Sequence, residues 1–402
     1  MSDLRESGTV PRQPFVRRLR IRNYKSIEKC DIRLSSLTVL VGLNGSGKSN
    51  FLDALRFVAD SLKSPIEHAL QLRGGIDAVR RISTGHPHNF AISLEVSLPK
   101  SESATYGFEI SARAKGGFEI RHEQLELSGR APRFYRVEDG RLAKSSETNM
   151  PPLLPDRLYL TNASGLPVFR PIYDALSSMG FYNLNPDAMK ELQNPDAGEL
   201  LHRDGSNIAS VVARLKSERP EIMDRVDQFL GTIVPGIVGA ERIPLGPRET
   251  LLFKQAVEGS KHPWKFYATN MSDGTLRAFG TLVAITQLAN GHSSVSLVGI
   301  EEPETALHPA AAGALMEALR EASWRTQVLV TTHSPDLLDQ MDASSEAVLV
   351  AKSDRGNTKI APIDKASHEA IQRHLSTPGE LLRLEQLEPD QDDLLRQMKL
   401  AL

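Results

Sequence analysis

Eight residues with the spacing G-x-x-x-x-G-K-S follow an apolar run and have the chemistry of a phosphate-binding loop. They read Gly42-Leu43-Asn44-Gly45-Ser46-Gly47-Lys48-Ser49. Glycines let successive backbone N–H groups turn towards an anion, a lysine pairs with the β- and γ-phosphates, and a serine hydroxyl ligates Mg²⁺. The alternative is a glycine-rich turn that binds nothing. We assign phosphate binding to Asn44, Gly45, Ser46, Gly47, Lys48 and Ser49, and Mg²⁺ to Ser49.

Two adjacent carboxylates, Glu301 and Glu302, follow a second apolar run at 295–300. A carboxylate at the end of a buried strand can hold the Mg²⁺ shell, and a second one can orient and polarise an attacking water. We therefore assign Glu301 to Mg²⁺, through water, and Glu302 to catalysis. Acidic residues often follow apolar strands, so the assignment depends on the combination with the phosphate-binding loop.

A histidine, His333, ends a third apolar run at 327–332. Lone histidines are usually structural. At the end of a strand near the same crevice, however, an imidazole can hydrogen-bond the γ-phosphate or the attacking water. We favour this second role for His333.

A fourth segment, Ser272-Asp273-Gly274-Thr275-Leu276-Arg277, precedes an apolar helical run at 278–288. The Ser272 hydroxyl and the backbone amides at Gly274 could bind an anion at the start of this helix. Taken alone, the segment is explained as well by an ordinary capped helix.

The elements that must position these residues follow from the apolar periodicity. The loop lies between a strand at 37–41 and a helix with Phe51, Leu52, Leu55, Val58 and Leu62 on one face. An alternating strand begins at Val16, and its stripe of Arg18, Arg20 and Arg22 is either a solvated face, which we favour, or a DNA contact. Lys25 and Ser26 at its end are candidates for touching the nucleotide.

The middle of the chain divides into a β-rich part and a helical part. The segments 90–96, 106–112 and 118–127 alternate as antiparallel strands do, whereas the Arg-, Pro-, Ser- and Glu-rich segment 128–156 predicts a mobile loop. A helical pattern extends from 185 to 252, with a helix start signal at Asp204-Gly205-Ser206-Asn207.

Composition restricts the class of protein. The chain has 402 residues, of which 40% are apolar and 24% charged, with a formal net charge of -2. This charge gives no global reason to expect nucleic acid or membrane as a partner. The single cysteine, the absence of a long apolar run and the polar start predict a cytoplasmic protein with no membrane partner.

The four motifs, in this order, resemble those of ABC-type ATPase heads of the RecF, SMC and OLD-like group. The opening Leu-Arg-Ile-Arg-Asn-Tyr-Lys-Ser-Ile is similar to the first strand of that group, and Asp204-Gly205-Ser206-Asn207 is similar to a motif of its OLD-like members. The resemblance implies ATP and Mg²⁺ as cofactors. The Ser-Asp-Gly-Thr signature argues against a transporter cassette, and the short stretch after the last core strand leaves no room for the nuclease domain of OLD-like nucleases.

The resemblance also implies that each ATP molecule is bound by residues of both protomers of a dimer. In such heads two protomers clamp two ATP molecules head to tail, so Ser272, Gly274 and Arg277 are expected to touch the partner's γ-phosphate. Residues 304–309 are expected at the dimer seam, and His333 is expected to be the switch histidine. A homodimer, or a higher homo-oligomer built through the helical part, is the expected assembly.

We therefore predict an α/β P-loop NTPase, an ABC-type ATPase head with an antiparallel β subdomain and an inserted helical lobe. The predicted boundaries are a disordered N-terminus at 1–14, ATPase lobe I at 15–165, a helical lobe at 166–264, ATPase lobe II at 265–365, and a C-terminal helical tail at 366–402.

Two functional hypotheses remain open from the sequence. In the first, ATP hydrolysis drives a DNA-repair or anti-phage-defence complex. In the second, the protein is a nucleotide-gated scaffold with slow turnover that holds and releases a separate effector protein, such as a nuclease or toxin. Stimulation of turnover by DNA would favour the first.

Overall fold

The computed structural model describes residues 13–83, 87–98, 102–129, 132–287, 295–342 and 347–399. The predicted disordered N-terminus therefore lies outside the described residues up to residue 12. Among the described residues, no helix combines the length and the apolar character needed to cross a membrane.

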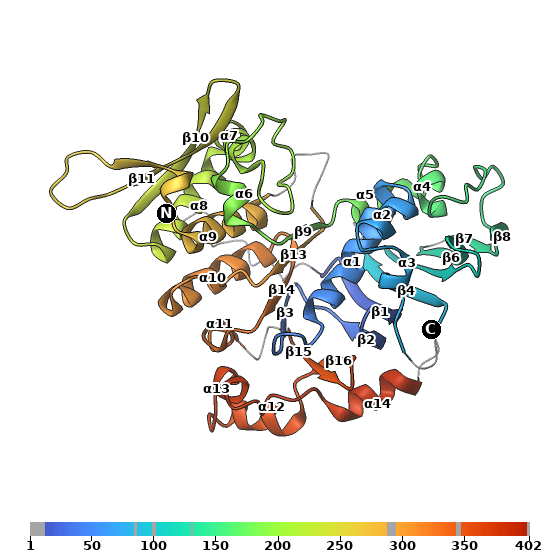
Figure 1. The fold of residues 1–402 in the computed structure, drawn as a ribbon. Helices are drawn as coiled ribbons and strands as arrows, with labels where there is room; N and C mark the ends of the chain where they lie inside the picture. The colour runs from blue at the N-terminus through green and yellow to red at the C-terminus, as the bar shows by residue number, and fades with distance from the viewer. Residues whose placement is uncertain are drawn as a thin grey trace.

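A six-stranded sheet forms the centre of the molecule, and both halves of the chain contribute to it (Figure 1). The order is β16-β15-β3-β14-β13-β9, and all neighbours are parallel except β15 and β16. Both β3 and β14 are buried along their whole length, as in a parallel sheet covered on both faces. The strands are β3 (Leu37–Val41), β9 (Gly180–Tyr182), β13 (Leu297–Glu301), β14 (Gln327–Thr332), β15 (Ala347–Asp354) and β16 (Asn357–Pro362).

Helices pack on both faces of this sheet. Leu40 of β3 packs in one hydrophobic cluster with Phe51, whereas Val39 packs in another with Leu282 and Leu315, because successive side chains of a strand point to opposite faces. The helices involved are α1 (Lys48–Lys63), α9 (Asp273–Thr286) and α10 (Ala312–Ser323). The predicted α/β P-loop architecture is confirmed.

A seven-stranded antiparallel sheet, the β lobe, lies beside α1, in the order β2-β1-β4-β5-β6-β7-β8. The predicted loop at 128–156 is wrong in part, because β7 and β8 form a hairpin there. Tyr135 and Val137 point inwards between exposed polar residues, so the polar composition hid an alternating strand. The strands are β1 (Val16–Tyr24), β2 (Ile27–Arg33), β4 (Asn89–Ser97), β5 (Ser103–Ala112), β6 (Phe118–Ser128), β7 (Arg133–Glu138) and β8 (Arg141–Ser145).

The arginine stripe on β1 is neutralised by the neighbouring strands. Arg18 pairs with Asp31 at 2.6 Å, Arg20 pairs with Glu95 at 2.6 Å, and Arg22 pairs with a carboxylate of β5 at 2.5 Å. These ion pairs support the interpretation of the stripe as a solvated sheet face.

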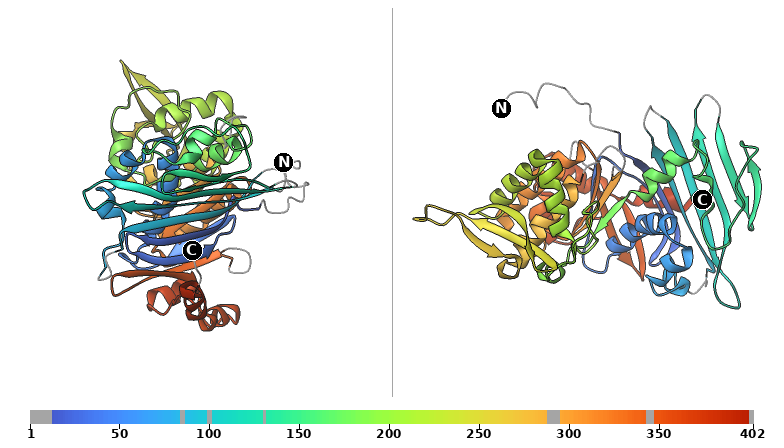
Figure 2. Two further views of the ribbon diagram at one scale, coloured as in Figure 1. Left: turned by 90° about the vertical axis from the view of Figure 1, so that its right-hand side faces the viewer. Right: turned by 90° about the horizontal axis from the view of Figure 1, so that it is seen from above.

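The helical lobe contains a sheet as well as helices. The segment β10-β11-β12 is antiparallel, and Phe253 of β11 packs on Phe279 of α9. The buried residues of β11 are consecutive and do not alternate with exposed polar residues, so their sequence pattern did not indicate a strand and was interpreted as helical. The elements are α6 (Pro186–Lys190), α7 (Ile208–Glu218), α8 (Pro220–Ile233), β10 (Ile237–Leu245), β11 (Arg248–Gln255) and β12 (Trp264–Tyr267). The helix α5 (Arg170–Ser177) packs instead on α1, in the core shared with the β lobe. In Figure 2 the β10–β11 hairpin and the β lobe lie at opposite ends of the molecule.

Short helices complete the fold. The last of them, α14, lies along β16 and β2, where Gln397 accepts a hydrogen bond from the Asp31 N–H and donates one to the Ile360 carbonyl (2.9 Å). These elements are α2 (Ile66–Gln71), α3 (Ile76–Val79), α4 (Tyr159–Ala163), η2 (Ala268–Asn270), η3 (Pro309–Ala311), α11 (Pro335–Leu338), α12 (Lys365–Gln372), α13 (Pro378–Arg383) and α14 (Gln391–Lys399).

Candidate nucleotide-binding site

The phosphate-binding loop joins β3 to the start of α1, and two of its glycines are required by geometry. Gly47 has φ 95°, and a Cβ there would lie 1.9 Å from the Thr358 hydroxyl oxygen. A Cβ at Gly42 would lie 2.3 Å from the Ala351 carbonyl oxygen. Strands β15 and β16 therefore hold the loop tightly from behind, and only glycine fits at either position.

Lys48 lies across this loop. Its ammonium donates to the carbonyls of Gly42 (2.7 Å) and Leu43 (3.1 Å), and its side chain is buried. Burial lowers the pKa of Lys48, although the charges of Glu302 and Glu304 oppose that shift. The ammonium is thus held inside the loop by hydrogen bonds to neutral carbonyl oxygens. An anionic oxygen that took their place would form stronger, charge-assisted hydrogen bonds with it.

The carboxylates Glu301 and Glu302 both stand at the end of β13, beside the ends of the parallel strands β14 and β3. Glu301 pairs with Thr331 in the β13–β14 register, and Thr332 pairs with Val41 at the end of β3, so these strand ends meet above the loop. Glu302 follows with φ 45°, and its backbone N–H donates to the Thr331 carbonyl (2.9 Å). This left-handed turn takes the chain out of the sheet at the expected catalytic position.

His333 lies beside Glu302. Its Nδ1 is 3.2 Å from Glu302 Oε1, and both side chains are partly exposed. An imidazole and a carboxylate in contact with each other can together hydrogen-bond a water molecule on the side that faces the loop. The structure therefore brings together Glu302, which the sequence analysis assigned to the water, and His333, which it assigned to the switch.

A third carboxylate, Glu304, adjoins this pair. The Thr332 hydroxyl donates to one of its oxygens, and the other oxygen is buried with no hydrogen-bond partner in the described part of the chain. Burial raises the pKa of Glu304, despite the Thr332 hydrogen bond and the charge of His333. The sequence analysis placed Glu304 only at a dimer seam. Its position two residues after Glu302 was the available signal for a role in the site.

The signature segment is built separately. The Ser272 hydroxyl caps α9 by accepting from the Thr275 N–H (3.2 Å), and Ser272 is exposed. A Cβ at Gly274 would lie 2.1 Å from the Ala306 carbonyl oxygen, so the helix start is pressed against the segment that follows Glu304. Within the described ranges no hydrogen bond or ion pair joins Ser272, Gly274 or Arg277 to the phosphate-binding loop of the same chain.

Comparison with protein families now adds to the geometry. Residues 37–159 and 230–339 match the family described as "AAA domain, putative AbiEii toxin, Type IV TA system", and together these stretches exceed half of the chain. The chain belongs to this AAA-domain family. A comparison with curated proteins finds no match.

Two solved structures are similar in fold to this AAA-domain protein. An Smc head bound to the C-terminal winged-helix domain of ScpA aligns with a TM-score of 0.57 and 16% identity, over 88% of this chain and 100% of that chain. An Smc head with an extended coiled coil, bound to the C-terminal domain of ScpA derived from Pyrococcus furiosus, aligns with a TM-score of 0.52 and 14% identity, over 90% and 100%. These structures show that the fold is that of an ABC-type ATPase head, and the AAA-domain family match identifies the chain as a nucleotide-binding P-loop ATPase.

The donors around the loop suit Mg²⁺. The Ser49 hydroxyl is exposed at the first turn of α1, and Glu301 supplies carboxylate oxygens. Mg²⁺ prefers such oxygen ligands and is usually bound by one or two protein groups together with substrate phosphates.

Three further residues of this ATPase adjoin the site. Ser26 bonds to the Thr358 hydroxyl (2.7 Å) behind Gly47 and accepts from the Asn50 amide (2.7 Å), while Lys25 pairs with Asp53 at 2.6 Å. Ser26 therefore braces the loop from behind, and its predicted contact with the nucleotide stays a prediction. Sequence reasoning missed Thr358, because no local motif marks it.

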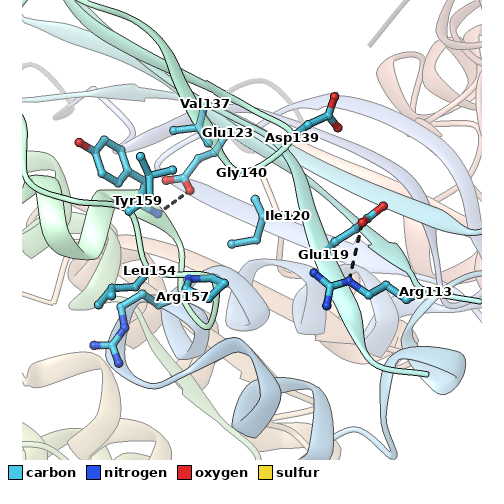
Figure 3. A pocket seen from close by; sticks show the side chains of 12 residues that line it. Arg113, Glu119, Ile120, Glu123, Val137, Asp139, Gly140, Leu154, Arg157 and Tyr159 are labelled. Carbon is cyan, nitrogen blue, oxygen red and sulfur yellow. Dashed lines mark hydrogen bonds and ion pairs between the residues drawn. The ribbon is translucent and has the colours of Figure 1, made fainter. Parts of the chain in front are cut away.

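A hollow lies in the β lobe, and none of the residues named above for the nucleotide site lines it (Figure 3). Its volume is about 190 Å³, and Glu123 stands at its inner end. Glu123 is fully buried and accepts from the Tyr135 hydroxyl (2.8 Å) and the N–H groups of Tyr159 (2.5 Å) and Leu160 (2.8 Å). Burial raises the pKa of Glu123 despite these bonds. Because the Glu123 oxygens accept hydrogen bonds from the first residues of α4, the role of this carboxylate is structural.

Proposed function

We propose that this AAA-domain protein binds and hydrolyses ATP with Mg²⁺ and that it acts as a head-to-tail homodimer. The observation that supports this best is the meeting of Lys48, Glu302 and His333 at one edge of the sheet, while the signature helix presents Ser272 to solvent elsewhere. We further propose that segments 15–165 and 265–365 form the ATPase core around the helical lobe.

On the loop side, each group has a definite task. The backbone amides of 44–48 and the Lys48 ammonium bind the β- and γ-phosphates, and Ser49 and Glu301 hold Mg²⁺. When bound, Mg²⁺ neutralises charge on the phosphate oxygens. Glu302 accepts a proton from the attacking water, and His333 orients that water and contacts the γ-phosphate.

On the signature side, the anion-binding groups are supplied to the partner. The exposed Ser272 hydroxyl, the amide of Gly274 and the guanidinium of Arg277 stand at the positive end of α9, a 14-residue helix. The γ-phosphate bound by one protomer completes its coordination with these groups of the other protomer. The close approach of Gly274 to Ala306 supports the proposal that residues 304–309 form the seam between the protomers.

We place the protein in the RecF and OLD-like group and propose that its ATP cycle drives a DNA-repair or anti-phage-defence complex. A second function is a nucleotide-gated scaffold that holds an effector protein. This second function is favoured by the two Smc heads described as bound to ScpA, because their fold carries a partner protein, and by the net charge of -2.

The test is steady-state ATP turnover, measured with and without double-stranded DNA. We expect Mg²⁺-dependent turnover that DNA accelerates, and we expect the Lys48→Ala variant to show none. Turnover that DNA leaves unchanged would support the scaffold function. Turnover that survives in Lys48→Ala would overturn the assignment of the loop.

A further inference from the structure

An arginine from the helical lobe reaches the position assigned to Mg²⁺. Arg203 Nη2 lies 3.1 Å from Oε1 of Glu301, the last residue of β13. The Arg203 side chain is 47% exposed and that of Glu301 is 19% exposed. The ion pair is therefore open to water on one side, and the arginine side chain can leave without unpacking a core.

The backbone beneath Arg203 is fixed. The Asn183 N–H, at the end of β9, donates to the Arg203 carbonyl (3.0 Å). The buried Asn207 accepts from the His202 N–H (2.7 Å) and donates to the Leu200 carbonyl (2.9 Å). Through these hydrogen bonds Asn207, four residues after Arg203, holds the loop that contains Arg203 from its inner side. The motif Asp204-Gly205-Ser206-Asn207 therefore sets the starting point of the Arg203 side chain and leaves only that side chain free to move.

Arg203 lies near another positively charged side chain, that of Arg56. Burial lowers the pKa of Arg56 on α1, and the charges of Arg73 and Arg203 lower it further. Asp53 and Asp60 pair with Arg56 at 3.1 and 3.4 Å, and Glu301 offsets the charge of Arg203. A divalent cation on Glu301 removes that offset and adds a repulsion of its own, so Arg203 and Mg²⁺ exclude each other at this carboxylate.

We propose that Arg203 is a positioning residue that occupies Glu301 until Mg²⁺ arrives, so that Mg²⁺–nucleotide binding releases the Arg203 side chain from β13. This inference rests on the Mg²⁺ role proposed for Glu301. It gives the helical lobe a direct means of responding to metal and nucleotide in its own protomer.

The test is a Mg²⁺ titration of nucleotide binding. N-methylanthraniloyl-ATP is bound to the full chain carrying Glu302→Gln, to prevent turnover, and fluorescence is followed as Mg²⁺ is added. We expect Arg203→Gln to lower the half-saturating Mg²⁺ concentration about fivefold, the factor that an exposed ion pair typically supplies. Binding of the analogue without Mg²⁺ is expected to stay unchanged.

Two variants make the result specific. Arg203→Lys keeps the charge and is expected to stay within about twofold of the parent. Arg219→Gln removes an arginine of the same lobe that pairs with Glu221 at 3.0 Å, and it is expected to change nothing. An unchanged or raised half-saturating concentration in Arg203→Gln would overturn the inference while leaving the ATPase assignment intact. Failure of the parent to bind the analogue at any Mg²⁺ concentration would overturn the proposed function as well.

Discussion

Two helix starts in this molecule are built for anions, and they differ in what surrounds them. At α1 the Lys48 ammonium is buried and the charges of two carboxylates, Glu302 and Glu304, act on it, whereas at α9 Ser272 is exposed and its neighbour Asp273 pairs with Lys190 at 2.6 Å. The first start has the groups proposed for metal and water chemistry, whereas the second has the Ser272 cap, the helix dipole and the Arg277 guanidinium, and no carboxylate proposed for catalysis. This difference is what the proposed head-to-tail dimer requires, in which each chain supplies two unequal parts of a site to be completed by different protomers.

The largest effect is expected at the first helix start. Lys48→Ala removes the only ammonium held inside the loop of the described structure and should abolish detectable ATP binding, a loss of at least about 100-fold. Isothermal titration calorimetry with ATP and Mg²⁺ measures this loss. Lys359→Ala, which removes an exposed lysine of β16, is the matched control. Tight ATP binding by Lys48→Ala would refute the loop assignment.

Glu302→Gln separates binding from chemistry at the same helix start. The amide keeps the shape of the side chain but cannot accept the water proton, so turnover should fall by about 10² to 10⁴-fold while ATP binding is retained. A coupled phosphate-release assay measures turnover. Hydrolysis at the unmodified rate would move the catalytic carboxylate to another residue, and Glu304 is the nearest candidate.

Ser272→Asp addresses the second helix start. Aspartate caps a helix as well as serine does, so α9 should stay folded, but its charge opposes a γ-phosphate presented by a partner. Turnover should fall about 100-fold, whereas ATP affinity at low protein concentration should be unchanged. Ser272→Asn, which caps without a charge, is the matched control. Equal turnover in the Asp and Asn variants would show that Ser272 does not meet a phosphate.

The smallest effect is expected at Glu304, between the two helix starts. Because burial raises its pKa, the folded state binds a proton there more tightly than the unfolded state does. Its contribution to stability is therefore complete below the ordinary carboxyl pKa of about 4.3 and is lost as pH rises through the raised value. Glu304→Gln should raise the melting temperature by about 2 °C at about pH 8 and leave it unchanged near pH 4.

Differential scanning fluorimetry across this pH range measures the shift at Glu304. Glu317→Gln, at an exposed carboxylate of α10, is the control and should show no pH-dependent gain. A gain of the same size at both pH values would mean that packing, and not the carboxylate charge, decides the stability at Glu304.

The parts of the fold that sequence analysis predicted are those with strong local signals. The loop, the strands ending at Glu301 and Thr332, and the start of α7 after Asn207 combine long apolar runs with glycine or capping residues. Strands β7 and β10 were missed, because short strands with polar outer faces have compositions similar to those of loops and helices.

The site was predicted only as far as its motifs extend. Arg203 meets Glu301 across 98 positions in the chain, and Thr358 meets Ser26 across 332. Such contacts depend on the packing of the helical lobe and of β16, and no residue spacing encodes them locally.

The most direct test of the head-to-tail account is the solution mass of Glu302→Gln, by light scattering coupled to size exclusion. We predict that the mass doubles when ATP and Mg²⁺ are added together, and that neither adding Lys48→Ala nor adding Ser272→Asp to this variant allows the doubling. A mass that does not respond to ATP and Mg²⁺ would contradict the account, because the signature helix would then have no phosphate of a second chain to bind.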